Sequence, residues 1–510
     1  MPHSHSLPRA LSSARRYSAT LSLLTATAFV AAAQAQDSGP LVDALVRKGI
    51  LTTAEAQDIR ADLTRDYNQS SAGKINLSNS ITELKLYGDL RLRYQYDNKD
   101  PQLNAPGVGV DNERELRSPS GSQQSRWRFR LRLNADFKLG RQWFGGVELQ
   151  TQASSDSGFT TFENGFSDYP IFISRAFLGW SPADSLTVTA GKVPNPFYST
   201  DLIWDADVNP TGITEALHFH KLFAPESVSG SFDGKTAVAR KTGELPWELS
   251  LVAGQFIFDD NLEGGGSDLS GASRDNDSTS DVYLFQTQFV AGYKFNKTTK
   301  LTIAPGWLVN TSGTLSDVNN ANSFNDNANV SGASRNLSLL LLPGDIGFNV
   351  GPVKARLFWD LAYNVEGRKR SEDIYNLVSL RAPGDDRVTD PDDFDKKHRN
   401  RDDIAWLVGV QLGENKKKGN WSLLASYRET GIAGVDPNLN ESDFAQSELN
   451  TRGIRFGASY NLTDFAVASV TYGWAWNLRE DLVGGEATGG NAIADSNDVQ
   501  VLQVDLNVKF

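Results

Sequence analysis

The chain has 510 residues, a formal net charge of −12 and no cysteine. Without cysteine it can form no disulfide and offers no thiolate, and its acidic balance argues against nucleic acid as a partner, because DNA affinity depends on neutralising phosphates. The mean hydropathy of −0.39 is usual for a soluble protein, but an outer-membrane β-barrel also averages low, since half of each strand faces a polar lumen.

The first 35 residues have the layout of a secretory signal peptide. Arg9, Arg15 and Arg16 precede an apolar run of small residues, and the triplet Ala33–Ala35 offers a cleavage site. A basic segment, an apolar core and an A-x-A triplet are the three parts of such a signal. We expect residues 1–35 to be removed during general secretion, because the residues after the arginine pair fit twin-arginine export poorly.

Residues 36–80 are predicted to form a short periplasmic helical hairpin. Apolar residues recur at helical spacing from Leu41, and Gly49 follows as a helix stop. Thr52 and Glu55 have the spacing of a capping box, which begins a second helix. The hairpin would serve as an oligomerisation or tethering element, or alternatively as a small plug near a barrel mouth.

From residue 83 onward the apolar period changes from that of a helix to that of a strand. Segments 84–96, 353–365, 451–462 and 501–510 alternate apolar and polar residues. They read as half-buried strands of about ten residues or more, the length that a tilted strand needs to cross a bilayer. No later run of about 18 apolar residues predicts a transmembrane helix.

The connections between these strands alternate in length. Polar stretches rich in Gly, Asn and Asp lie at 97–125, 156–169, 194–212, 259–281, 312–335, 367–402, 431–450 and 479–497. Tight turns lie between them, near residues 140, 183, 297, 351, 417 and 463. A hairpin barrel with short periplasmic turns and long extracellular loops has this pattern. Eight long loops imply about sixteen strands, although a strand within 213–245 is hard to place.

The alternative fold is a soluble two-sheet sandwich. Such a fold also alternates, but it has no reason to lengthen every second connection or to gather Trp near strand ends. The tryptophans concerned are Trp143, Trp180, Trp247, Trp307, Trp359, Trp406 and Trp421. We therefore predict an all-β fold, a transmembrane antiparallel up-and-down β-barrel of about 16 strands over residues 83–510.

The segment "GKVPNPFYSTDLIWDADVNPTG" (Gly191–Gly212) resembles the putative-porin family of Gram-negative outer membranes. That family has a strand ending in G-K/R, then N-P-F and W-D-x-D-x-N-P. The helical segment followed by "LYGDLRLRYQY" is also similar, and Phe510 matches the C-terminal aromatic that barrels present to the insertion machinery. An acidic residue commonly follows the N-P, but here it is Thr211, so no role is carried over to that side chain.

The resemblance implies a pore-forming barrel in the cell outer membrane, in contact with lipid and lipopolysaccharide. Porins at large are often trimeric, so a homotrimer is an option for this chain. The resemblance does not name a solute.

An arginine row is the first candidate site. In "RWRFRLRLNADFKL" (126–139), arginines alternate with apolar residues, which would put the arginines in a water-filled lumen. Together with two arginines of a neighbouring strand, the pore-lining candidates are Arg91, Arg93, Arg126, Arg128, Arg130 and Arg132. Such a row facing carboxylates makes a transverse field that biases ion passage. The alternative is that these arginines are merely solvated.

The opposing carboxylates would come from segment 194–212 if it folds into the barrel. Its Pro and aromatic residues make it stiff, which suits an inward loop better than a mobile one, although an ordinary external loop stays open as an alternative. The constriction candidates are Asn195, Pro196, Phe197, Trp204, Asp205, Asp207 and Glu215.

The sequence gives only weak indications of metal binding or catalysis. His218 and His220 share one strand face but lack a third ligand, and the acidic run 384–397 lacks the spacing of a calcium loop. No hydrolase, zinc-protease or phosphate-loop motif occurs, and histidine is scarce. We expect no enzyme activity, no cofactor and no metal.

The predicted function is passive diffusion of small hydrophilic solutes through an outer-membrane porin with a bias toward anions. Two alternatives stay open. One is a substrate-specific channel for anions such as phosphate or organic acids, and the other is a non-conducting structural or adhesive barrel.

Overall fold

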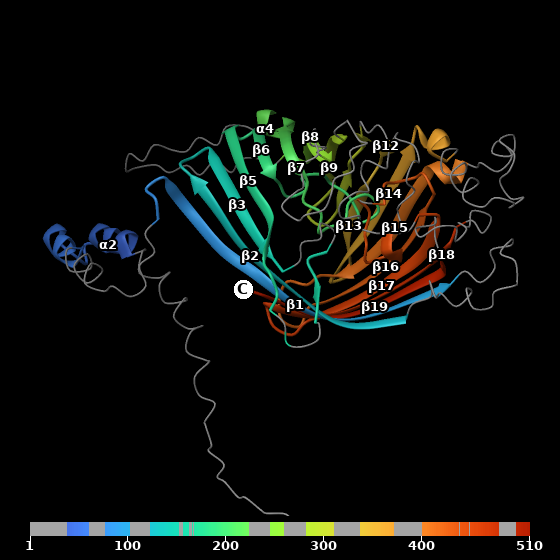
Figure 1. Ribbon diagram of the computed structural model, residues 1–510. Helices are drawn as coiled ribbons and strands as arrows, with labels where there is room; N and C mark the ends of the chain where they lie inside the picture. Colours follow the sequence, from blue (N-terminus) through green and yellow to red (C-terminus); the bar gives the residue numbers. More distant parts are fainter. Residues whose placement is uncertain are drawn as a thin grey trace, which may run out of the picture. The chain divides into compact units, whose positions relative to one another are not determined.

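A computed structural model of the chain is shown in Figure 1. It describes residues 38–60, 77–101, 123–151, 157–162, 166, 168–223, 245–259, 282–310, 337–371, 400–437, 439–447, 449–478 and 496–510. The chain divides into two compact units, Met1–Asn79 and Ser80–Phe510. The predicted signal segment 1–35 lies outside the described residues.

The first unit contains the helices predicted for it. Helix α2 (Ser38–Arg47) is followed by Gly49, whose φ of +69° is the left-handed conformation of a helix C-terminus. A second helix covers residues 53–60. At its start the Glu55 amide donates to Thr52 Oγ1 (3.3 Å), while the Thr52 amide donates to Glu55 Oε2 (2.8 Å). These reciprocal bonds form the predicted capping box.

No helix in the described part of the chain is long and apolar enough to cross a membrane.

The second unit is a single antiparallel sheet. Its first strands are β1 (Ile81–Pro101), β2 (Gln123–Leu139), β3 (Trp143–Gln150), β4 (Thr160–Thr161), β5 (Phe172–Ala183), β6 (Leu186–Lys192), β7 (Thr211–His218), β8 (Trp247–Asp259) and β9 (Val282–Lys294). The remainder are β10 (Lys300–Ile303), β11 (Gly306–Asn310), β12 (Ser338–Leu341), β13 (Gly344–Val350), β14 (Val353–Asn364), β15 (Ile404–Gly413), β16 (Trp421–Thr430), β17 (Thr451–Asn461), β18 (Ala466–Asn477) and β19 (Ser496–Lys509).

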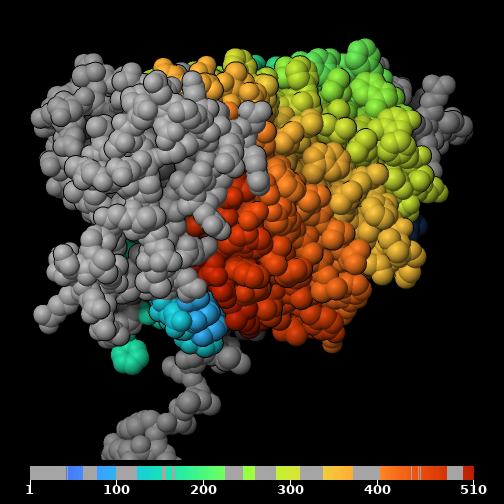
Figure 2. All heavy atoms as spheres, turned by 90° about the vertical axis from the view of Figure 1, so that its right-hand side faces the viewer, coloured from blue at the N-terminus to red at the C-terminus, as the bar shows by residue number. Residues whose placement is uncertain are grey.

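The sheet closes on itself, because β1 pairs with both β2 and β19. Strands β10 and β11 both pair with β9, and β12 and β13 both pair with β14, so each of these pairs is one interrupted wall strand. The short β4 pairs with β2 from within a loop. The described residues therefore form a closed barrel of sixteen wall strands, as predicted. In Figure 2 the strands follow one another around the wall from yellow to red, with β1 in blue beside β19.

Short turns join the strands at one end of the barrel and longer loops join them at the other end, with one exception. Tight turns such as Gly351 (φ +60°) join strands at the end that holds both strand termini of the barrel, here called the short-turn end. The exception is the connection between β7 and β8, where helix α4 (Phe219–Phe223) begins a long segment whose residues 224–244 lie outside the description. That segment is where a strand was hard to place from sequence.

The wall has an apolar outer face and a largely polar inner face. In β9, Phe285 and Phe289 are 38% and 48% exposed, whereas the alternating Gln286 and Gln288 are buried. Large exposed apolar residues around a closed sheet are what a lipid-facing surface requires. Trp143 and Trp180 stack near the short-turn end with ring centroids 6.0 Å apart.

The tryptophan prediction fails at one position. Trp359 lies in the middle of β14, where its ring packs over Gly344.

The main apolar core lies inside the barrel. It joins the inner faces of β8, β9, β11, β12, β14 and β15 to two loops, the β6–β7 loop (193–210) and the β16–β17 loop (431–450). Figure 1 shows loop segments within the ring of strands.

Candidate pore constriction

Strand β2 carries its arginines on the inner face of the barrel. Trp127 is 63% exposed on the outer face, whereas Arg130, three residues on, is only 3% exposed. In the register of β1 with β2, Arg91 faces Arg130 and Arg93 faces Arg128. Directly opposed like charges destabilise a sheet, so this arginine patch needs compensation.

Part of the compensation comes from carboxylates of β1. Asp89 accepts hydrogen bonds from Arg132 Nε (2.8 Å) and Arg130 Nη2 (3.4 Å), and Asp97 pairs with Arg126. The two aspartates thus flank the opposed arginines, one at each end of the row, and hold them through charge-assisted bonds.

Arg93 joins the patch to two further parts of the chain. Its Nε donates to Asp505 Oδ1 of β19 (2.8 Å), and its Nη1 donates to Asp443 Oδ2 of the β16–β17 loop (2.9 Å). Arg91 and Arg128 have no carboxylate within ion-pair distance among the described residues. Arg128 donates instead to Gln95 Oε1 (3.0 Å).

Phe159, from the loop between β3 and β5, covers the arginine patch. Its ring is 3% exposed, and the guanidinium carbons of Arg93, Arg130, Arg128 and Arg91 lie 4.0, 5.2, 5.4 and 5.7 Å from its centroid. The expectation that these arginines all face open water is therefore corrected. They lie on the inner face, but an aromatic ring and two loops cover part of them.

The β6–β7 loop crosses the lumen. Asp207 Oδ1 accepts from Arg130 Nη1 of β2 (2.9 Å), while Thr200 Oγ1 donates to Asp360 Oδ2 of β14 (2.8 Å). Since β2 and β14 lie on nearly opposite sides of the ring of sixteen strands, the loop is tied to both walls.

Aromatic packing anchors the same loop to the wall. Phe197 and Trp204 stack with ring centroids 6.4 Å apart, and both meet Phe256 of β8 edge-on. Trp204 Nε1 donates to Gln286 Oε1 of β9 (2.8 Å). At the start of the loop, Asn195 Oδ1 accepts from the Phe197 amide (3.1 Å), so Asn195-Pro196 forms a rigid entry turn.

The β16–β17 loop also folds inward. The Asp205 amide donates to the Leu439 carbonyl (2.6 Å), and the amide and hydroxyl of Ser442 both donate to Asp205 Oδ2 (3.1 and 3.2 Å). The two loops are therefore hydrogen-bonded to each other inside the barrel.

The inward course of the β16–β17 loop was missed in the sequence. Its polar residues suggested a solvated external loop, but apolar residues recur among them and every one of the following is at most 7% exposed: Ile432, Val435, Leu439, Phe444 and Leu449. The recurrence of apolar residues in this loop was the sequence feature that could have predicted its inward course.

Buried carboxylates meet where the two loops join. Burial, together with the nearby Asp207 charge, raises the pKa of Asp205 to about 7. Burial and the Asp205 charge raise the pKa of Glu441. Burial would also raise the pKa of Asp443, but the Arg93 cation outweighs it and lowers that pKa to about 2. The junction therefore combines a fixed ion pair, Arg93–Asp443, with two carboxyls whose pKa values burial raises.

Glu215 does not belong to this site. In β7, Thr214 is buried and faces the lumen, whereas Ile213 is 43% exposed and faces outward. Side chains alternate along a strand, so Glu215 shares the outer face with Ile213. Its carboxylate accepts from Gln255 Nε2 (3.1 Å), another residue of the outer face. The expectation that Glu215 opposes the arginines is therefore wrong, because the alternation of β7 points it outward.

The two histidines have ordinary partners. His218 Nδ1 lies 2.8 Å from Ser250 Oγ, and His220 Nδ1 lies 3.1 Å from the Leu249 carbonyl. Within the part of the chain that the structure describes, no group of three or more potential ligands could hold a metal ion. The acidic run 384–397 lies outside that part.

No curated protein matches the sequence. Solved structures similar to the chain include OmpF of Salmonella typhi in complex with daunomycin (12% identity, 86% of this chain and 100% of that chain, TM-score 0.40). An anion-selective porin from Comamonas acidovorans (12%, 84% and 99%, 0.39) and a loop-deletion mutant of OmpT from Vibrio cholerae (9%, 85% and 100%, 0.37) are also similar.

A family model described as "Putative porin" matches residues 13–335, which is more than half of the sequence. With its closed sixteen-stranded barrel and apolar outer wall, the chain belongs to the putative porin family of outer-membrane channels.

Proposed function

We propose that the chain is a passive diffusion channel for small hydrophilic solutes, narrowed by the β6–β7 and β16–β17 loops. A barrel of sixteen strands leaves an aqueous interior, and here one loop is tied to both β2 and β14 across that interior. This cross-lumen connection is the observation that carries the proposal, because the loop narrows the lumen and so forms the constriction that solutes must pass.

Conductance of the purified protein in planar bilayers tests the proposal. We expect stepwise openings with the wild type and a larger unit conductance for Asp207→Ala, which releases the loop from Arg130 and Arg132. Lys354→Ala, in an ion pair with Glu414 (2.8 Å) at β14, is the matched control. A correctly inserted but ion-tight barrel would refute the channel and favour the structural or adhesive alternative.

A bias toward anions is the second part of the proposal. Arg91 and Arg128 are the members of the arginine patch without a carboxylate partner among the described residues, so their charges are available to a passing ion. Four other arginines of the patch are neutralised by aspartates. The expected bias toward anions is therefore weak. A weak bias fits a general diffusion channel better than a channel specific for phosphate or organic acids.

Reversal potentials in a salt gradient test the bias. Arg128→Gln should shift selectivity toward cations, whereas Arg128→Lys keeps the charge and should not. Equal reversal potentials for wild type and Arg128→Gln would remove this part of the proposal.

Further assignments accompany the channel. We place the N-terminal helical unit in the periplasm and take Phe510 as the signal to the insertion machinery, with lipopolysaccharide and a homotrimeric partner as expected contacts. Crosslinking in intact outer membranes would test the trimer.

A further inference from the structure

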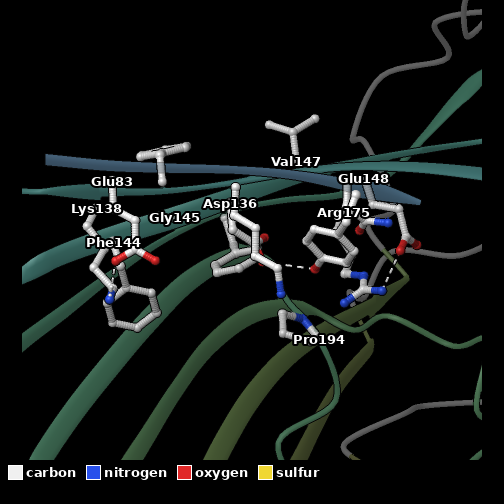
Figure 3. A pocket seen from close by; sticks show the side chains of 14 residues that line it. Glu83, Asp136, Lys138, Phe144, Gly145, Val147, Glu148, Arg175 and Pro194 are labelled. Atoms are coloured by element: carbon white, nitrogen blue, oxygen red, sulfur yellow. Dashed lines mark hydrogen bonds and ion pairs between the residues drawn. The ribbon is translucent and has the colours of Figure 1, made fainter. Parts of the chain in front are cut away.

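A cavity of about 340 Å³ lies on the inner wall near the short-turn end of the barrel. Figure 3 shows its lining, which comes from β1, β2, β3 and β5 together with Pro194, at the beginning of the β6–β7 loop. Its volume is at the lower end of the range for small-molecule sites. The arginine patch lies farther along the same strands, so this cavity is a separate site.

Most of the charges in the cavity are already paired. Glu83 pairs with Lys138 at 2.6 Å, and Glu148 pairs with Arg175 (Figure 3). Both pairs bring one carboxylate and one cation, so they add no net charge. What remains is one cation and one anion.

These two charges are Lys85 and Asp136, which are direct cross-strand neighbours on β1 and β2. Lys85 Nζ lies 4.6 Å from the centroid of the Tyr87 ring, and the Tyr87 hydroxyl donates to Asp136 Oδ2 (2.9 Å). Among the described residues neither charge has an ion-pair partner. The tyrosine connects them without neutralising either.

Because Gly146 has no side chain, the Asp136 carboxylate and the Phe177 ring pack closely against the backbone of β3. A Cβ added to Gly146 would lie 2.6 Å from Asp136 Oδ1 and 2.9 Å from the Phe177 ring. No hydrogen-bond partner of that oxygen is found in the described residues. Asp136 Oδ1 and the Phe177 ring therefore occupy the position that a side chain would take at Gly146, and both groups line the cavity.

Apart from the Tyr87 hydroxyl and the Asn134 amide, the rest of the lining is apolar. Phe144 and Phe177 come from β3 and β5, and Pro194 closes the side toward the loop. Phe144 lies over Gly179, where an added Cβ would meet its ring at 2.2 Å. The cavity thus offers a cation, an anion and an apolar surface at separate positions.

We infer that this cavity binds a zwitterionic α-amino acid with an apolar side chain, its carboxylate on Lys85, its ammonium on Asp136 Oδ1 and its side chain against Phe144, Phe177 and Pro194. A simple anion would be attracted by Lys85 but repelled by Asp136, and a simple cation would be attracted by Asp136 but repelled by Lys85. Only a ligand with both charges pairs both groups. The inference deepens the proposed channel, because it names a solute class that the channel would hold on its way through.

Binding to the purified full-length protein in detergent micelles tests the inference without relying on conductance. Isothermal titration calorimetry would compare phenylalanine with N-acetylphenylalanine, which lacks the ammonium, and phenylalaninamide, which lacks the carboxylate. We expect phenylalanine to bind about tenfold more tightly than either analogue. Equal binding of N-acetylphenylalanine would overturn the inference in favour of a plain anion site.

Variants locate the site. Lys85→Met and Asp136→Asn should each weaken phenylalanine binding about tenfold. Gly146→Ala should weaken it as well, because its methyl group would displace the Asp136 carboxylate and the Phe177 ring. Lys354→Met is the matched control, because Lys354 belongs to β14 and pairs with Glu414 at 2.8 Å. If the first three variants bind phenylalanine as Lys354→Met does, the inference is wrong. Conductance with no binding would refute only the site, whereas binding without conductance would refute only the channel.

Discussion

Arg93 Nη1 and Asp443 Oδ2 lie 2.9 Å apart, which joins the first strand of the barrel to a loop 350 residues later in the chain. The Arg93 side chain is 3% exposed and also holds Asp505. One guanidinium therefore fixes both the seam between β1 and β19 and the inward position of the β16–β17 loop.

Removing this guanidinium should be costly. Arg93→Ala leaves two carboxylates without their cation in a buried setting, and loss of one partner of a buried pair costs about 3–5 kcal/mol of unfolding free energy. Urea unfolding of the barrel in detergent would measure it. The control is Lys138→Ala, whose ion pair is 60% and 55% exposed, so it should change stability by less than about 1 kcal/mol.

The junction of the two inward loops should weaken at alkaline pH. The pKa of Asp205 is raised from 3.8 to about 7, so the docked junction keeps a proton that an undocked one has released between those values. Its stability is highest near pH 4 and is lost as the pH rises through 7. The lowered pKa of Asp443 has the opposite sign, and its contribution is lost only as the pH falls from 3.8 toward 2.

Unit conductance and proteolysis of the β16–β17 loop at pH 5 and pH 9 would measure this effect. We expect a wider and more cleavable channel at pH 9, and a much smaller difference in Asp205→Asn, which stays neutral throughout. A wild type with the same conductance and cleavage at both values would contradict the prediction.

Trp204 should hold the β6–β7 loop against the wall. It is 3% exposed and bonded to Gln286, so Trp204→Ala should cost about 3–5 kcal/mol and widen the lumen. Thermal unfolding and unit conductance would show both effects. Trp127→Ala removes a tryptophan that is 63% exposed on the outer face and should leave conductance unchanged.

The end of the chain should tolerate little change opposite Phe510. The Gly88 amide donates to the Phe510 carbonyl (2.8 Å), the Phe510 amide returns a bond to Gly88 (3.0 Å), and a Cβ on Gly88 would lie 2.9 Å from the Phe510 ring. Gly88→Val should destabilise the barrel by about 1–3 kcal/mol. Gly347→Val, where nothing lies within 4 Å, is the control for valine in a strand, and equal melting temperatures would refute the prediction.

The barrel could be predicted because alternation and loop length depend on local sequence. The strand pattern of β1, β14, β17 and β19 reflects which face each residue occupies, and the structure confirms the resulting count of sixteen. Glu215 was misplaced because β7 is short and lies next to the segment that sequence could not resolve. With the strand position uncertain, the face of any residue in it is uncertain too.

The site was less predictable, because its partners come from distant segments. The alternation of β2 shows that its arginines share a face, but not that Phe159 covers them or that Asp443 reaches Arg93. Those contacts depend on where loops fold once the wall exists. Charge and composition alone do not specify which carboxylate meets which arginine.

The pairing of β1 with β19 also has a consequence for timing. On one of its two edges, β1 pairs through residues 89–101 with residues 496–509, the last strand in the chain. Contacts of such sequence separation form slowly, because a long loop must close before they stabilise anything. Until then both edges of an apolar, lipid-facing sheet lie open to other chains. The barrel therefore cannot close before its last strand is available, although β1 can already pair with β2.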